Sequence, residues 1–435
     1  MTQLWRGGMW LSVLGLLLLT RGASAQIILP VGTPSVAGVA LDSEGMIRAR
    51  EVEGQPNLAL LRARVKLAEE APKAEALTYV SLPRLLAQVR ELSKAAKPIP
   101  QDLRCMGGLT QLRYVFVFPE QKDLVLAGYA EEIDATTAVE PVGKASGRPV
   151  LQLEDLIVAL RTIDQPNGKS FFGCSIDTVP DALKKSDEVA AKYGNAPKAE
   201  LLKRMADAIG PQKVSVINTA ADTRLAFVMV AADFKLKRFT MGLETSPVVA
   251  IGNAVDNSRS AACRFWFAPS YEPLLVTAAG DAYAIRGARL QLKSGAQSFD
   301  ERGATDKAKA FAKKFTENIP ALAATNPLFA DLQNIADMAL LAALIRADKL
   351  DQKVGLDMDW AISSYDVTKV VVPRTTETQV NVTGGSVASG GVALSMMPLV
   401  GETAREKASD GTLAALKQRP TEGWILKASL ESPKK

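Results

Sequence analysis

The sequence predicts an α+β protein with mixed layers, in which helices are interspersed among several hairpins. Two observations support this class. Runs rich in β-branched and aromatic residues come in neighbouring pairs joined by short turns, which is typical of antiparallel hairpins. Apolar residues at helical spacing lie between these pairs, without the regular strand–helix alternation of a parallel βαβ array.

The first elements are expected soon after the N-terminal segment. Residues 36–51 hold two apolar runs around a turn and predict a hairpin, and the apolar spacing over 58–68 predicts a helix. Ser81 is expected to cap the next helix, which has a proline in its first turn. The clearest hairpin joins residues 112–118 to 124–130.

The remaining elements alternate in type. They are a strand running into a helix at 147–164, strands at 170–177 and 213–219, helices at 178–194 and 198–210, successive strands at 263–292, a helical segment at 304–348 and a β-rich segment at 363–396. Pro320 and Pro327 should break the helical segment, because proline lacks the N–H that a helix interior needs.

Residues 222–244 carry the densest apolar patterning. A helix is favoured here, with apolar stripes on two sides, so that it would pack between two layers. Asp222 is the expected N-cap, Gly242 the expected stop, and Asp233 and Lys237 would form an i,i+4 pair. A buried strand with a solvated continuation is the alternative.

These elements suggest five parts. The expected organisation is a signal peptide at 1–25, an N-terminal α+β domain at 26–165, a central α+β domain at 166–350 that ends in a helical segment, a β-rich segment at 351–400 and a polar, partly disordered tail at 401–435.

The first residues have the pattern of a Sec-type signal peptide. Arg6 precedes an apolar run at 9–19 that is too short to span a bilayer, and Ala23 and Ala25 offer small side chains at the cleavage site. An uncleaved membrane anchor is the alternative. Cleavage predicts export to the periplasm or the extracellular space. No transmembrane helix is predicted in the mature chain, where 338–345 is the longest candidate.

Composition limits the chemistry that the chain can perform. Its 52 basic and 47 acidic residues give a formal charge of +5, and loss of Arg6 and Arg21 would lower this to +3, so nucleic acid is not a predicted partner. Histidine is absent, which removes Ser-His-Asp and Cys-His catalysis and HExxH zinc sites. Catalysis would need carboxylates, lysine, tyrosine or a carboxylate-bound metal.

Cys105, Cys174 and Cys263 are too few for a disulfide framework. Three buried thiols are favoured, and one disulfide with a free thiol is the alternative. Cys174 precedes a helix whose dipole could stabilise a thiolate, but a structural thiol is favoured because no histidine can pair with it.

Asp357 and Asp359 are the candidate metal ligands. In an extended segment their carboxylates would face the same way, and Asp366 could supply a third oxygen. Ca²⁺ is the candidate ion, while an acidic surface loop is the favoured interpretation and no cofactor is predicted. The glycine-rich residues 383–391 could form an anion-binding nest, but a flexible hairpin loop is favoured.

Arg224, Lys235 and Arg238 form a narrow basic strip on the helix expected at 222–244. They are candidates for contact with an anion or a partner, with solubilising charges as the alternative. Glu131, Glu132 and Asp134 follow the clearest hairpin, and two such carboxylates could divide acid and base roles, as in glycoside hydrolysis, but a solvated hairpin end is favoured.

Many segments resemble a domain-of-unknown-function family of secreted bacterial proteins, seen mainly in planctomycetes. The matching stretches include "VSLPRLLAQV", "GGLTQLRYVFVFPEQKDLVLAGYAEE", "GRPVLQLEDLIVALR", "GCSID", "DTRLAFVMVAADFKLKRFTMGLE" and "NPLFADLQNIADMALLAALI", within 38–345. The resemblance implies export, and it carries no activity, ligand or catalytic residue to this chain.

Together these features predict an exported protein that is a non-catalytic binding or structural component of the cell envelope, with an envelope protein or polymer as its partner. A secreted hydrolase that uses carboxylates is the alternative. The hydrolase requires a deep pocket with converging carboxylates, whereas a binding protein requires an exposed apolar or charged surface.

Overall fold

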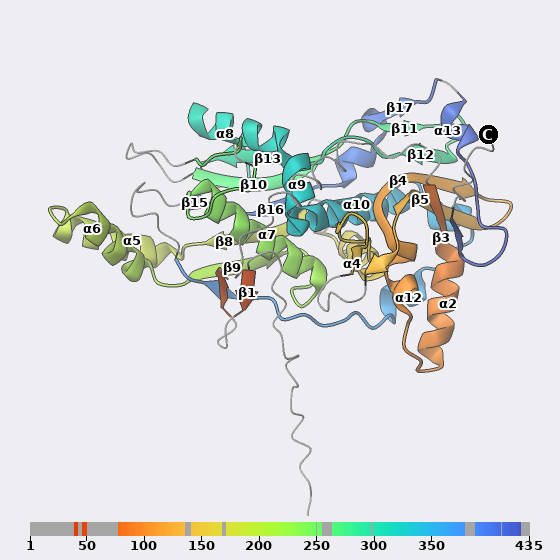
Figure 1. Cartoon of the computed structure of the whole chain (residues 1–435), viewed down its shortest axis with the longest axis horizontal. Coiled ribbons are helices and arrows are strands. Elements are labelled where there is room, and N and C mark those ends of the chain that lie inside the picture. The colour runs from red at the N-terminus through yellow and green to blue at the C-terminus, as the bar shows by residue number, and fades with distance from the viewer. Residues whose placement is uncertain are drawn as a thin grey trace, which may run out of the picture. The chain divides into compact units, whose positions relative to one another are not determined.

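The computed structural model describes residues 39–41, 46–49, 77–134, 141–167, 171–248, 250–254, 263–296, 299–378, 388–409 and 411–427. Two large sheets, a two-stranded sheet and the helices packed on them make up this part, which confirms the α+β class (Figure 1). The predicted signal peptide and the helix expected at 58–68 lie outside the described residues.

The larger sheet has the strand order β1-β2-β14-β9-β8-β16-β10-β13, with β15 also paired to β10. Its strands are β1 (Val39–Leu41), β2 (Ile47–Ala49), β8 (Phe172–Asp177), β9 (Gln212–Ile217), β10 (Cys263–Ser270), β13 (Arg289–Gly295), β14 (Thr375–Thr376), β15 (Ala388–Ser389) and β16 (Val392–Leu394). The antiparallel pair β1–β2 confirms the hairpin expected at 36–51. The described residues of the segment expected to be β-rich contribute β14, β15 and β16, and residues 365–374 have no strand pairing.

The second sheet has the order β17-β11-β12-β4-β5-β3-β18. Its strands are β3 (Leu77–Ser81), β4 (Leu109–Phe118), β5 (Asp123–Ala130), β11 (Leu274–Val276), β12 (Ala282–Ala284), β17 (Arg405–Lys407) and β18 (Ile425–Lys427), and β6 (Ile133–Asp134) with β7 (Val142–Gly143) forms the small sheet. The antiparallel β4–β5 pair confirms the clearest predicted hairpin. Strands from the last part of the chain complete both large sheets, and the predicted domain boundaries stay a prediction.

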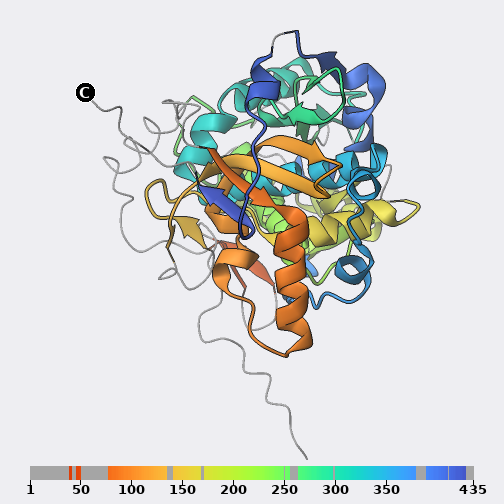
Figure 2. The same cartoon turned by 90° about the vertical axis from the view of Figure 1, so that its right-hand side faces the viewer.

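The helices are α2 (Leu82–Lys94), α3 (Gln101–Arg104), α4 (Leu153–Asp164), α5 (Pro180–Tyr193), α6 (Lys198–Ile209), α7 (Arg224–Thr240), α8 (Asp306–Glu317), α9 (Ile319–Thr325), α10 (Pro327–Ala347), α11 (Leu350–Lys353), α12 (Asp359–Ser363) and α13 (Thr412–Ala415). Short 3-10 turns occupy η2 (Met106–Gly108), η3 (Met397–Val400) and η4 (Glu402–Ala404). α2 follows β3 directly and packs against β5 (Figure 2). Ser81 caps α2 as predicted, since its hydroxyl accepts from Arg84 N at 3.4 Å.

α10 is the central helix of the core. It contacts β13 of the larger sheet, β4 of the second sheet, and α4 and α7. The helical segment breaks at the two prolines as predicted, since Pro320 is the second residue of α9 and Pro327 the first of α10. By length and apolar composition α10 is the one helix in the described part that could cross a membrane, yet its most apolar stretch is completely buried by the rest of the protein. Such burial fits the core helix of this fold.

Two local predictions were wrong. The N-cap of α7 is Thr223, whose hydroxyl accepts from Ala226 N at 3.3 Å, while the carboxylate of Asp222 pairs with Lys369. Residues 147–152 form only an isolated bridge at Pro149 in place of the strand expected before α4, because a proline cannot donate to a ladder. α7 itself is helical as favoured, and the chain leaves it at Gly242 with φ +65°.

Candidate functional site

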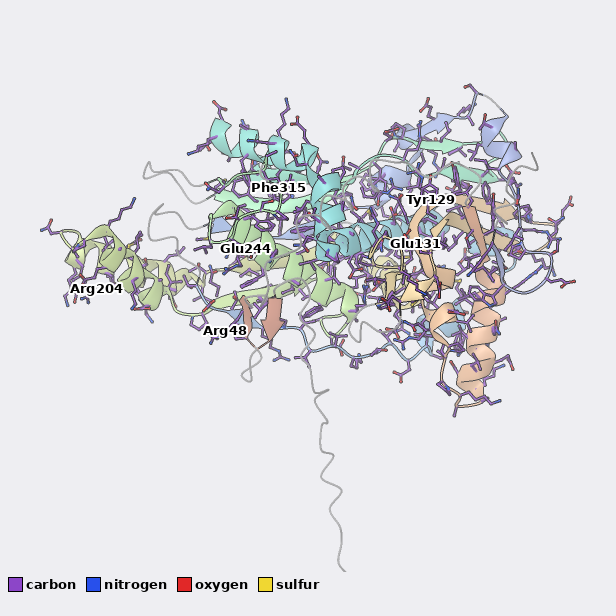
Figure 3. All side chains as sticks on the ribbon, in the orientation of Figure 1. Arg48, Tyr129, Glu131, Arg204, Glu244 and Phe315 are labelled. Atoms are coloured by element: carbon purple, nitrogen blue, oxygen red, sulfur yellow. The ribbon has the colours of Figure 1, made fainter. Side chains whose placement is uncertain are left out.

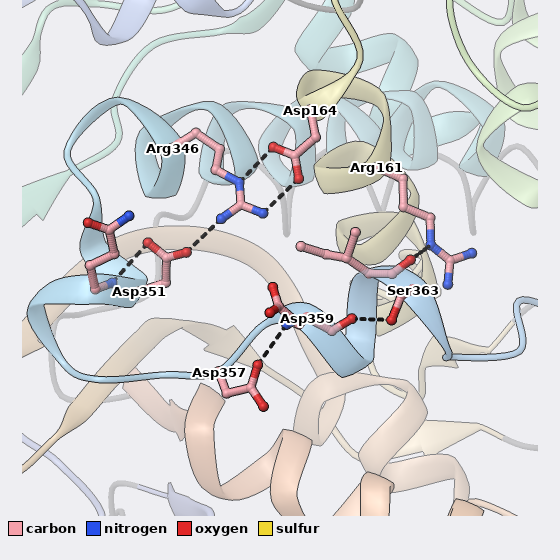
Figure 4. Close-up of polar contacts among 9 residues, drawn as sticks. Arg161, Asp164, Arg346, Asp351, Asp357, Asp359 and Ser363 are labelled. Carbon is pink, nitrogen blue, oxygen red and sulfur yellow. Dashed lines mark hydrogen bonds and ion pairs between the residues drawn. The ribbon is translucent and has the colours of Figure 1, made fainter.

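The three aspartates predicted to bind metal do not converge. Asp357 accepts from the backbone N–H of Asp359 at 2.9 Å (Figure 4). It also pairs with Arg90 at 3.3 Å. Asp366 lies near the guanidinium of Arg161. Among the described residues, no three acidic or thiol side chains are placed to hold one ion. Calcium binding at these aspartates stays a prediction.

The predicted basic strip on α7 engages carboxylates within the protein. Arg224 contacts carboxylates of α4 and α10, and Lys235 pairs with Glu244. Arg238 also pairs with Glu244, labelled in Figure 3, at 3.1 Å. Lys235 is only 4% exposed. Contact of this strip with an external anion or partner stays a prediction, and the three cations already have internal counterions.

Glu131 and Glu132 hold the β6–β7 hairpin. Glu131 accepts the backbone N–H groups of Ala145 at 2.9 Å and Ser146 at 2.8 Å, and Glu132 pairs with Lys144 at 3.0 Å. A Cβ at Gly143 would lie 2.6 Å from the carboxylate of Glu131. These contacts assign Glu131 to the closing of a turn.

All three cysteines are free thiols in this structure. Cys105 and Cys174 are buried and Cys263 is partly buried, in agreement with the favoured interpretation. Burial raises the pKa of Cys105 to about 11 and raises that of Cys174 well above its usual value. Burial therefore opposes the thiolate that a reactive Cys174 would need.

Arg224 is the centre of one buried ionic network. Its guanidinium contacts Asp155 of α4 and Asp331 of α10, and the Gln152 amide oxygen accepts from its Nε at 2.9 Å when that amide is suitably oriented. Burial raises the pKa of Asp155 to about 7 although Arg224 opposes the rise. The network joins three helices and lines none of the hollows described below.

A second buried network surrounds Asp233 and Lys237 of α7. The predicted i,i+4 ion pair does not form, because Lys237 Nζ donates to Gln212 Oε1 of β9 at 2.7 Å and Asp233 accepts no hydrogen bond. Burial raises the pKa of Asp233 and lowers that of Lys237. A Cβ at Gly390 would lie 1.8 Å from Asp233 Oδ1, so the described end of the glycine-rich segment is a close packing contact.

A third buried network joins α10 to β13 and to the residue that follows β10. Asp337 accepts from Tyr271 Oη at 3.0 Å and from Arg289 Nε at 3.2 Å, and Arg289 also donates to the carbonyl of Leu112 at 2.9 Å. Burial raises the pKa of Asp337. The three carboxylates with raised pKa are therefore closed inside the core rather than exposed to a substrate.

The hollows at the surface of the described part include three that matter for binding. One of about 310 Å³ lies beside Trp360, and its carboxylates Glu91 and Asp357 are paired with α2 cations. Another, of about 200 Å³, lies beside Tyr114. The third has about 700 Å³ and lies between β9 and the unpaired residues 369–374. We call the third hollow the β9 groove.

The β9 groove exists because β9 has a partner strand along only part of one edge. β14 pairs with Lys213 and Gln212 alone, and Val214 N–H donates to Arg374 O at 2.8 Å. On the N-terminal side of Arg374 the chain curves away from β9. It is next fixed at Val370, whose N–H donates to Asp222 O at 3.1 Å. The groove lies between these two backbone contacts, and Val214, Val216, Val370, Val371, Val372 and Pro373 form its apolar walls.

The two ends of the β9 groove differ in charge. At one end the side chains of Lys213 and Arg374 are exposed and have no carboxylate partner within the described residues. At the other end Asp222 and Lys369 neutralise each other at 2.6 Å. Val371 in the apolar wall is 62% exposed.

The sequence predicted no binding role for any residue of this groove, and it marked Asp222 only as a helix cap. The signal that could have found it is "TKVVVPR", in which three valines precede Pro373, a residue that cannot donate to a ladder. Such a run has strong strand propensity but is confined to an edge. The position of the run opposite Val216 comes only from the fold.

Comparison with known families gives one match. A family model described as "Protein of unknown function (DUF1598)" matches residues 174–253. This segment holds most of β8, together with α5, α6, β9 and α7, so one wall of the β9 groove lies within it. Comparisons with curated proteins and with solved structures found no match. The match supports the expected resemblance to a domain-of-unknown-function family over this segment.

Proposed function

We propose that this protein is an exported, non-catalytic binding component of the bacterial cell envelope, and that it holds a protein partner in the β9 groove. The groove carries the proposal, because within the described part of the chain it combines an exposed valine wall, a free strand edge and two cations without carboxylate partners. The predicted signal peptide supports export, and the small net charge gives no support to nucleic acid as the partner.

The chemistry of the carboxylates also favours binding over hydrolysis. A carboxylate hydrolase needs acids of shifted pKa that face a substrate. Asp155, Asp233 and Asp337 have raised pKa values, but they are at most 1% exposed and line none of the three hollows. Their burial supports a structural role for all three.

The proposal is tested by capture from an envelope extract with the mature protein, followed by mass spectrometry. Val371→Glu places a charge in the apolar wall of the groove, and Leu183→Glu is the matched control, since Leu183 is 51% exposed on α5. We expect a specific partner whose capture falls at least tenfold with Val371→Glu and is unchanged with Leu183→Glu. Equal capture by all three proteins, or equal loss in both variants, would contradict the assignment to the groove.

Export has its own test. Cell fractionation should place the protein outside the cytoplasm, and N-terminal sequencing of the mature form should begin at Gln26. A full-length protein retained in the cytoplasm would contradict the envelope role.

A further inference from the structure

We infer that the β9 groove accepts the C-terminal end of a partner polypeptide, which adds a short strand beside β9 and places its terminal carboxylate at Lys213 and Arg374. The inference rests on the proposed binding function and names the partner's chemistry. It follows from the direction of the free backbone groups, the length of the gap and the charge at its closed end.

The first step is the direction of the backbone groups of β9. In an antiparallel ladder, successive residues direct their N–H and C=O groups to opposite edges. Val214 donates toward Arg374, away from β8. Val216 has the same orientation, and no described strand pairs with it on that side. The groove therefore presents one free donor and one free acceptor to an extended peptide, which is how strand addition achieves its main-chain contacts.

The second step is the length of the free edge. Only residues 215–217 lie between the Val214 contact and the end of β9. At about 3.3 Å per residue this free edge is about 10 Å long. A longer strand from the middle of a partner polypeptide would clash with the chain at the hydrogen bond between Val214 and Arg374. A partner polypeptide that ends at this point fits the groove without having to turn away.

The third step is charge complementarity. The chain end that reaches the Val214 contact lies beside Lys213 and Arg374, two cations of the groove that have no carboxylate partner among the described residues. The terminal carboxylate of a bound peptide continues the line of its main chain, so it would lie at the end of the groove that the Val214–Arg374 contact closes. The peptide's side chains would instead project above or below the sheet. Lysine and arginine are the usual donors to such a carboxylate. The peptide would therefore run antiparallel to β9.

The apolar walls of the β9 groove indicate which side chains the bound peptide carries. Val214 and Val216 point to one face of β9, and Val370, Val371 and Val372 form the opposite wall. A bound strand would place alternate side chains against these valines. β-branched residues at alternate positions from the terminus match this surface best, because they combine strand propensity with apolar area.

The test uses two synthetic libraries of randomised hexapeptides that differ only in a free C-terminal carboxylate or a C-terminal amide. The immobilised mature protein should retain at least tenfold more of the free-acid library, with valine, isoleucine or threonine enriched at alternate positions. Lys213→Gln/Arg374→Gln should abolish this difference. The matched control, Lys184→Gln/Lys203→Gln on the exposed surfaces of α5 and α6, should preserve it. Circular dichroism checks that both variants fold.

Equal retention of the two libraries by the wild-type protein would overturn the inference, as would retention that is indifferent to Lys213 and Arg374. If a partner is still captured in a manner that depends on Val371, the proposed function stands and only the C-terminal partner is excluded. If enriched peptides bind but no envelope protein is captured through the groove, the cellular role fails and the inference about the groove stands.

Discussion

Helices α6 and α7 carry five charged residues each, but these residues differ in their exposure to solvent. All five on α6 are exposed. On α7, Asp233, Lys235 and Lys237 are at most 4% exposed, and the partly buried Arg224 lies between two carboxylates. Figure 3 labels Arg204 of α6. It also labels Glu244, which forms ion pairs with Lys235 and Arg238 of α7. Charge content alone therefore does not distinguish a solvated helix from a core helix.

The neighbours of the two helices explain the difference. α6 packs chiefly against α5, so its outer side faces solvent. α7 contacts α4, α10 and several strands of the larger sheet. A charge in such surroundings is tolerated only with a partner, because removal from water costs several kcal/mol, of order 3–5, when the partner is missing. Arg224, Lys235 and Arg238 have carboxylate partners outside α7. Asp233 has no hydrogen-bond partner among the described residues, and burial raises its pKa, which favours its uncharged form.

The largest expected effect comes from an unpartnered charge in α7. Val228 is 0% exposed, so Val228→Asp should prevent folding, with a loss of more than about 4 kcal/mol in the free energy of unfolding. Ala199→Asp on the exposed side of α6 is the control and should fold normally. Circular dichroism and proteolysis measure both. A normally folded Val228→Asp protein would show that the register of α7 is wrong.

A smaller loss is expected when a buried pair is broken. Arg224→Met leaves Asp155 and Asp331 buried without their common counterion, so the free energy of unfolding should fall by about 3–5 kcal/mol. Arg204→Met removes an exposed ion pair with Glu200 and should change little. Urea unfolding measures both variants, and equal changes would remove the distinction between the two helices.

The last prediction concerns pH, for which the expected change in the free energy of unfolding per pH unit is the smallest of the three. Burial raises the pKa of Asp233 above its ordinary 3.8, so the folded protein keeps a proton that the unfolded chain has released. The free energy of unfolding therefore falls as the pH rises from 3.8 through the raised value, by at most about 1.4 kcal/mol per pH unit for one proton. Asp233→Asn should flatten this fall.

The control for the pH experiment is Asp207→Asn, an exposed aspartate on α6. Urea unfolding at a series of pH values should give this variant the wild-type profile. If the Asp233→Asn profile also runs parallel to the wild type, Asp233 does not keep its proton in the folded protein.

The elements that local chemistry specifies were predictable from the sequence. Ser81 caps α2, Pro327 begins α10, and the strong strand runs of β4 and β5 form a hairpin, because each signal acts within a few residues. The N-cap of α7 was placed one residue too early because Asp222 and Thr223 are both good caps, and Asp222 pairs instead with the distant Lys369.

The candidate site was not predictable to the same degree. The residues singled out beforehand, Asp357 and Asp359 among them, do not converge, because contacts with Arg90 and the local backbone fix them separately. Lys213 and Arg374 meet at the groove although they are far apart in the chain, and only the pairing of β14 with β9 brings them together.

The sequence alone determined the α+β class, the absence of histidine chemistry and most helix and strand positions, since composition and periodicity are local properties. The tertiary structure decided which charges are buried and where a strand edge stays free. A charge is stabilised by partners that come from distant elements, as Asp331 of α10 serves Arg224 of α7. A free edge exists only where no distant segment completes the ladder, and among the described residues none does so at Val216.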